Sequence, residues 1–207
     1  MKNESMLYFS NLNDFSNFVY ALDIYNGWRI NSGILNSRGE KIRDKEYTKK
    51  LRKIFNDKKL FRRSVSISEI VSWLDSYLII NRFIFELQKN ILPIDFDNFQ
   101  IYCEYKINLS KMRRIDFILA YQNKVLLIEF RLTDKFSNLS NNWNKKMLEL
   151  IIYKELLSNY LDSKTKIYLY AFISLPEYRD KEKLVKHIEY NNNSINHMVQ
   201  YVIEYML

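Results

Sequence analysis

Apolar residues recur along the first ninety positions with the spacing of helices. Stretches in which every third or fourth residue is apolar are typical of helices that bury one face. They predict helices at about 13–24, 45–60 and 66–89. The last of these has capping-box spacing at its start, with Ser66 followed by Glu69, and Pro93 lies just beyond its end.

The pattern changes near residue 100, where β-branched and aromatic residues become frequent and apolar residues alternate or run continuously. Strands are predicted at about 100–109, 114–121 and 125–132, and the polar turn 122–124 joins the last two as a hairpin. The elements predicted beyond the hairpin are a helix at 142–160, a strand at 167–174, and helices at about 180–190 and 194–206. This order predicts an α/β or α+β fold in which helices cover a mixed sheet.

Charge is distributed unevenly along the 207 residues, which carry a formal net charge of +8. Residues 41–63 hold eleven basic and three acidic side chains, so the rest of the chain is neutral overall. Two interpretations of the predicted basic helix stay open: a solvated face, and a surface that binds the phosphates of a nucleic acid. The second interpretation predicts a set of nucleic-acid-binding residues on this helix: Lys49, Lys50, Arg52 and Lys53.

The remaining composition excludes several classes of protein. Cys103 is the single cysteine, which excludes an intrachain disulfide and a zinc site built from cysteines. No apolar run reaches the length of about 18 residues that a membrane span needs, and the first residues lack the pattern of a secretory signal. We therefore expect a cytoplasmic protein with no membrane segment. The absence of a glycine-rich phosphate loop argues against an NTP-driven motor.

Two carboxylates interrupt the apolar strands of the predicted hairpin. Asp116 lies in the first strand and Glu129 in the second, with Arg131 on the same side of the second strand as Glu129. A buried carboxylate without a partner costs several kcal/mol, so a cation is expected between the two acids. That cation is either Arg131, in a structural salt bridge, or a hard metal ion, and the pattern leaves both open.

The motif Ile115-Asp116, followed 13 residues later by Glu129-Phe130-Arg131, resembles the signature of the PD-(D/E)XK nuclease superfamily. The resemblance extends over about residues 66–175 and implies a restriction-endonuclease-like αβββαβ core. Under it, residues 1–65 are an N-terminal helical, basic accessory segment, and residues 66–207 are the nuclease-like domain with C-terminal helices.

The resemblance also implies roles for individual residues. Asp116, Glu129 and the Phe130 carbonyl would hold Mg²⁺ or Mn²⁺, which would activate a water for attack on a phosphodiester. Arg131 stands where the family has Lys; a guanidinium offsets negative charge but cannot act as a base. Lys145 or Lys146 could supply the displaced amine, and both are also expected to bind nucleic acid.

Further members of the implied site come from other predicted elements. The family's additional helical glutamate maps to Glu86, with Glu104 as a competitor on the first strand, opposite Ile101 and Cys103. Tyr153 maps to a tyrosine that contacts nucleic acid or the site, whereas Glu149 stands where the family has Gln.

The expected function is a metal-dependent nuclease acting on DNA more than on RNA, in restriction, repair, recombination or phage defence. The alternatives are an inactive nuclease-like binding or assembly module and a structural interaction protein whose hairpin charges form a salt bridge. The sequence does not decide whether the protein forms a homodimer or binds a partner protein.

Overall fold

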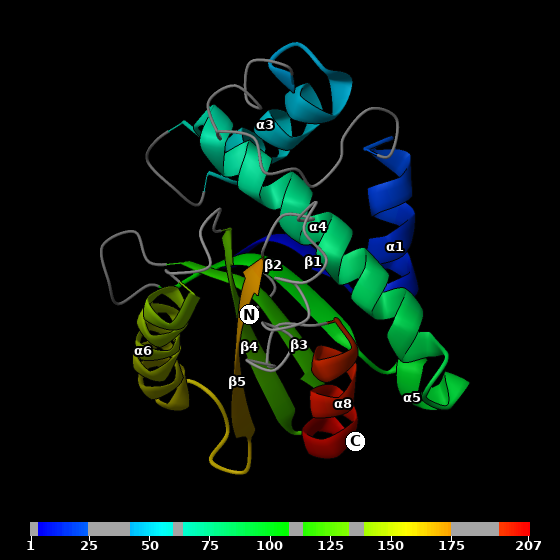
Figure 1. Cartoon of the computed structure of the whole chain (residues 1–207), viewed down its shortest axis with the longest axis vertical. Helices are drawn as coiled ribbons and strands as arrows, with labels where there is room; N and C mark the ends of the chain where they lie inside the picture. Colours follow the sequence, from blue (N-terminus) through cyan, green and yellow to red (C-terminus); the bar gives the residue numbers. More distant parts are fainter. Residues whose placement is uncertain (1–3, 25–41, 60–63, 108–113, 133–138, 175–194) are drawn as a thin grey trace.

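A computed structural model describes residues 4–24, 42–59, 64–107, 114–132, 139–174 and 195–207 (Figure 1). The helix predicted at 180–190 and parts of the basic segment, including Lys41, Arg62 and Arg63, lie outside the described residues. Within these ranges the chain forms β1 (Ser5–Phe9), α1 (Leu12–Ala21), α3 (Glu46–Lys58), α4 (Ile67–Gln88), α5 (Pro93–Asp97), β2 (Gln100–Lys106), β3 (Arg114–Tyr121), β4 (Lys124–Leu132), α6 (Leu139–Ser158), β5 (Lys166–Ser174) and α8 (Ile195–Met206).

The strands form one mixed sheet in the order β1-β2-β3-β4-β5. The first three pairings are antiparallel, and β5 lies parallel to β4 after the crossover through α6. The α/β class predicted from the pattern is confirmed. The pattern missed β1 and the short helix α5. Pro93 begins α5, where its missing N–H costs nothing because the first N–H groups of a helix have no partner within the helix.

Helices cover both faces of this sheet (Figure 1). The larger core lies between one face and the helices α1, α3, α4 and α8. A smaller core lies on the other face, where Leu150, Tyr153 and Leu157 of α6 pack against the strands. The helix α6 is therefore separated by the sheet from the rest of the helical layer.

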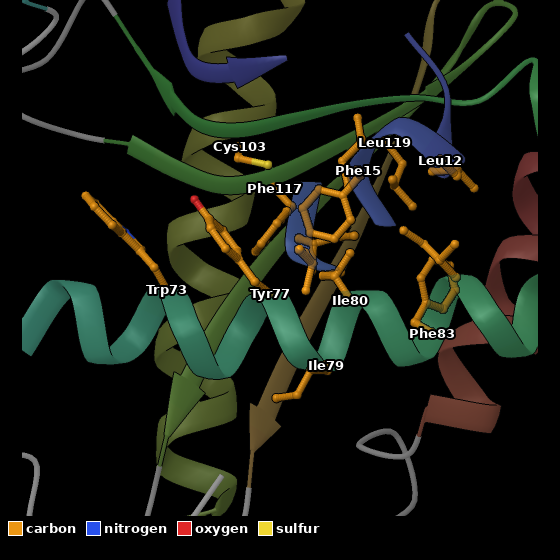
Figure 2. Packing of buried hydrophobic residues seen from close by; sticks show 14 of the residues in the cluster. Leu12, Phe15, Trp73, Tyr77, Ile79, Ile80, Phe83, Cys103, Phe117 and Leu119 are labelled. Atoms are coloured by element: carbon orange, nitrogen blue, oxygen red, sulfur yellow. The ribbon is translucent and has the colours of Figure 1, made fainter. Parts of the chain in front are cut away.

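The long helix α4 is buried along most of its length because it crosses the sheet. The predicted capping box is confirmed: Ser66 and Glu69 satisfy each other's backbone N–H groups. Figure 2 shows Trp73, Tyr77 and Phe83 pointing from α4 toward the strands and α1, whereas Ile79 points the other way. The polar residues Asp75, Ser76 and Asn81 are also buried on this helix, which an ordinary amphipathic pattern does not explain.

The N-terminal segment belongs to the same folded unit as the rest. β1 pairs with β2, and α1 packs against α4 within the larger core. On α3, the Phe55 ring lies 5.7 Å from the ring of Trp73 on α4, measured between centroids. Among the described residues, the boundary predicted at residue 65 does not separate two cores, and the segment before it contributes a strand as well as helices.

The alternation of side chains along β2 reverses at Glu104. Its backbone has φ of 54°, a left-handed conformation that costs a non-glycine residue about 1 kcal/mol or more. Ile101 and Cys103 face the larger core, whereas Tyr105 and Ile107 face the smaller one. Regular alternation would place all four on one side of the strand, but a strand keeps its period of two only while its backbone stays extended.

None of the described helices combines the length and the apolar character needed to cross a lipid bilayer.

Candidate functional site

The sheet opens at the two acids of the hairpin. Backbone pairing between β3 and β4 runs from the turn as far as Phe117 and Ile128 and ends one residue before Asp116 and Glu129. On the other side of β3, the register with β2 also passes over the position where Asp116 would face Glu104. Asp116 thus lies where β3 separates from β4 and where its register with β2 is interrupted, before that register resumes at Ile115 and Arg114.

The two carboxylates replace the missing backbone pairing. The Phe130 N–H donates to Asp116 Oδ2 at 2.8 Å, and the Asp116 N–H donates to Glu129 Oε1 at 3.2 Å. Each acid is therefore fixed by the backbone of the opposite strand, and both side chains are held at the same opening. The approach of these acids across the hairpin agrees with the sequence-based prediction.

The base that joins the acids comes from α6 and not from the hairpin. Lys146 Nζ lies 2.6 Å from Glu129 Oε2 and 2.8 Å from Glu149 Oε2. Arg131 is exposed, and among the described residues it forms no ion pair with either acid. The predicted salt bridge to Arg131 is thus corrected: the crossover helix brings Lys146 over Glu129, while Arg131 extends into solvent beside the opening.

A second charged cluster lies next to the first, centred on Arg114. Its Nη1 lies 2.9 Å from Glu69 Oε1 on α4, and its Nε pairs with Glu104 on β2. The guanidinium also lies over the Trp73 ring, 5.5 Å from its centroid. Arg114 therefore ties α4 to the paired ends of β2 and β3, next to the interrupted position at Glu104.

Both clusters line one hollow of about 340 Å³ between α4 and the open strands. On the α4 side the wall is polar, with Ser68, Ser72, Asp75 and Ser76 spaced as one helical face. The lining holds four acids and three bases, and Glu129 adds a fifth acid behind Asp116. The hollow therefore holds more acidic than basic side chains, although the chain as a whole is basic.

The acids of the hollow are harder to ionise than ordinary carboxyls. Burial raises the pKa of Glu104 to about 8 and outweighs the opposing effect of Arg114. Burial also raises the pKa of Asp116, against Lys146, and burial together with Asp116 raises the pKa of Glu129 well above its usual range. For Lys146, burial favours the neutral form, but Glu129 and Asp116 outweigh it and raise its pKa, so it stays an ammonium ion.

The donor atoms at the opening suit a hard divalent cation. Mg²⁺ is commonly held by one or two carboxylates while it keeps several waters. Asp116 and Glu129 provide two carboxylates at one point, and the excess of acids gives a cation a favourable place. Among the described residues, no group of three or more His, Cys, Asp or Glu side chains is placed to hold a metal ion. Any ion here would rest mainly on these two acids, on the Phe130 carbonyl and on water.

Some predicted residues lie away from the hollow. Glu86 pairs with Lys89, 2.9 Å away, and lies about 26 Å along α4 from Glu69, given 1.5 Å per helical residue. The acids of α4 that line the hollow are Glu69 and Asp75, so the expectation that Glu86 belongs to the site is corrected. Tyr153 is buried in the smaller core, with a pKa raised by burial and by Glu129, and is not open to a nucleic acid. Lys145 is exposed on the outside of α6.

The predicted nucleic-acid-binding residues of α3 do not line the hollow either. Lys49 pairs with Glu46 at 2.7 Å, and Lys50 donates to the Ala21 carbonyl oxygen at 3.3 Å. Lys53 is exposed and Arg52 is half-buried. The basic surface and the acidic hollow are thus separate parts of one folded unit, joined through the contact of Phe55 with Trp73.

Sequence reasoning missed the cluster around Arg114. The sequence predicts only a capping role for Glu69, yet its second carboxylate oxygen binds Arg114. One usable signal was the pair Arg114 and Asp116, both charged at the start of an apolar strand. Another was Asp75 next to Ser76 in the middle of an apolar helix.

No family model matches this chain, and comparison with curated proteins and with solved structures found no significant match.

Proposed function

We propose that this protein is a metal-dependent nuclease with a restriction-endonuclease-like core, of the PD-(D/E)XK type, that hydrolyses phosphodiester bonds in nucleic acid. The observation that carries the proposal is the opening of the sheet at Asp116 and Glu129, with Lys146 placed 2.6 Å from Glu129. At this point of an otherwise apolar sheet, backbone pairing is lost and charged groups are buried, and both cost free energy. Such a local loss of stability is typical of a functional site. The order α4, β2, β3, β4, α6, β5, with β5 parallel to β4, also supports it.

In this proposal Asp116 and Glu129 hold Mg²⁺ or Mn²⁺, whose chemistry when bound is to polarise the phosphodiester and to acidify a water. The chain's own residues have distinct tasks. Lys146 stays charged, so it acts as a hydrogen-bond donor and as positive charge, not as a base. In the family that the chain resembles, the lysine of the motif has this role. Arg131 stands at that position here, and we assign the role to Lys146. Arg131, at the mouth of the hollow, meets the phosphate from the solvent side.

The cluster of Glu69, Glu104 and Arg114 supports this arrangement. Arg114 pairs with both acids, and Glu104 lies beside the break in pairing at Asp116. These contacts fix the paired ends of β2 and β3 against α4. We therefore give the three residues a positioning role, because they hold the strand that carries Asp116.

The test is cleavage of labelled single- and double-stranded DNA and RNA in the presence of Mg²⁺, Mn²⁺ or a chelator. We expect cleavage with either metal and none with chelator. Asp116→Asn keeps the size of the side chain and should reduce the rate at least about a hundredfold. Asp97→Asn, an exposed acid on α5, is the matched control and should cleave like the wild type.

A second pair of variants tests which base serves the site. Lys146→Gln should abolish cleavage, whereas Arg131→Gln should reduce it less, since Lys146 contacts Glu129 directly. Equal loss in both variants would contradict the part given to Lys146.

The second candidate is a nuclease-like module that binds nucleic acid without cutting it. The ion pair of Lys146 with Glu129 favours it, because an ammonium ion already compensates this acid. Wild-type protein that cuts no substrate with either metal, yet still binds nucleic acid, would overturn the enzyme and establish the module.

A further inference from the structure

The crossover helix α6 has two unlike faces. Its inner face is buried against the sheet through Leu150 and Tyr153 and carries Lys146 into the hollow. Its outer face exposes large apolar side chains, although exposed helix surfaces are usually polar. Leu148 is 62% exposed, Ile151 43% and Ile152 38%. In Figure 1, α6 lies apart from the other helices, on the opposite face of the sheet. None of the other described helices or strands covers the outer face of α6.

Charges of opposite sign flank this apolar centre. Lys145 lies one turn before Leu148, and Glu155 lies about one turn after Ile152. At 100° per residue, these four positions share one face of the helix. Lys145 and Glu155 are both exposed, and within the described part of the chain neither forms an ion pair.

The sequence of this face is symmetric about Leu150. Lys145 and Glu155 are each five residues from that point, and Leu148 and Ile152 are each two residues from it. A second copy of the helix, turned end to end, therefore sets each lysine opposite a glutamate and each leucine opposite an isoleucine. Self-complementarity under a two-fold rotation is what a closed homodimer requires of a single surface patch.

We propose that the outer face of α6 is a homodimer interface, in which α6 packs antiparallel against α6 of a second copy. Leu148 contacts Ile152 of the partner subunit at the centre. Lys145 pairs with Glu155 of the partner subunit, and the same pair recurs on the other side of the axis. The apolar centre supplies affinity and the flanking pairs fix the antiparallel orientation.

The exposed apolar residues at α5 lack this arrangement. Leu92 and Ile94 on and before α5 are 66% and 70% exposed, but their charged neighbours in the helix are Asp95 and Asp97, both acidic. A two-fold pairing of that surface would bring like charges together. Ile94 therefore serves as a control position of similar exposure.

The test is the mass of the protein in solution, measured by sedimentation equilibrium across micromolar concentrations at low salt. The wild type should have twice the chain mass of 25.2 kDa. Leu148→Glu should weaken the dimer about a hundredfold, because it places a charge in the apolar centre. Ile94→Glu should dimerise like the wild type. Circular dichroism verifies that each variant is folded.

Charge reversal tests the orientation. Lys145→Glu alone and Glu155→Lys alone each set like charges opposite one another and should weaken the dimer at least about tenfold. The double variant restores both pairs and should recover the wild-type affinity. A mixture of the two single variants should also dimerise, because each lysine again meets a glutamate.

A monomeric wild type would overturn the proposal. A dimer that is unaffected by Leu148→Glu, or one that the double variant fails to restore, would overturn it as well, since the contact would then lie elsewhere. The readout is mass and not cleavage, so the result stands apart from the proposed nuclease activity.

Discussion

The acidic hollow and the basic helix α3 hold their charges in opposite ways. In the hollow, Glu104 and Glu129 are each only 1% exposed, and their partners Arg114 and Lys146 are largely buried with them. On α3, most charged side chains extend into solvent, as in the pair of Lys49 with Glu46. Burial costs charged groups their hydration, whereas exposed charges keep it.

The difference shows which charges the fold depends on. Removing one partner in the hollow leaves a buried charge behind, whereas removing a lysine from α3 leaves only water. The charges of α3 are thus free to act on a partner at long range, and those of the hollow act only on what enters it. Three experiments test this contrast.

The largest effect is expected for Lys146. Lys146→Met leaves Glu129 buried without its cation and should lower the free energy of unfolding by about 3–5 kcal/mol at neutral pH. Lys53→Met, on the exposed side of α3, should change it by less than about 0.5 kcal/mol. Urea denaturation followed by circular dichroism measures both. Similar decreases in the free energy of unfolding of the two variants would show that the fold depends equally on the charges of both regions.

The next effect concerns the pH dependence of stability. The pKa of Glu104 is raised from 4.5 to about 8, so the folded protein binds a proton there that the unfolded chain has released. The stability that this proton contributes is complete below about pH 4.5 and is lost as the pH rises through 8.

Glu104→Gln removes this titration. Its free energy of unfolding should therefore fall less than that of the wild type between pH 5 and pH 8, by up to a few kcal/mol. Glu46→Gln on α3 should leave the wild-type profile in this range almost unchanged, because that carboxylate is exposed and Lys49 lowers its pKa from 4.5, so it titrates below pH 5. Urea denaturation at a series of pH values measures both. Parallel profiles for Glu104→Gln and the wild type would contradict the raised pKa.

The smallest effect is expected on α3 and concerns binding. Replacing Lys49, Lys50, Arg52 and Lys53 with glutamine should weaken DNA binding and flatten its dependence on salt, by a slope of about 0.7–0.9 for each phosphate that the protein no longer neutralises. Fluorescence anisotropy at a series of salt concentrations measures this. Among single variants, Lys53→Gln should have more effect than Lys49→Gln, since Lys49 already pairs with Glu46. Unchanged affinity in the fourfold variant would show that this surface is only solvated.

Local patterns predicted the elements well. The strand predicted at 114–121 agrees with β3 at both ends, and the helix predicted at 66–89 agrees with α4 to within one residue. The capping box of Ser66 and Glu69 could also be predicted, because both partners lie within one helical turn. Such features depend on residues that are neighbours in sequence.

The site was predicted only in part. The approach of Asp116 to Glu129 follows from a hairpin with a short turn, so the sequence could predict it. The choice of Lys146 over Arg131 depends on how α6 lies across the sheet after the chain leaves β4. The side of β2 on which residues after Glu104 lie depends on the left-handed backbone of Glu104 itself, which the spacing of apolar positions does not predict.

The sequence by itself thus determined the helices, the hairpin and the presence of two costly acids within it, because periodicity and turn chemistry act over a few residues. The tertiary structure decided that β1 joins the sheet, that Glu69 and Arg114 belong to the site, and that a lysine from another layer compensates Glu129. Those contacts join residues far apart in the chain. They form only because the two faces of the sheet must both be covered, which brings α4 and α6 to the place where the strands separate.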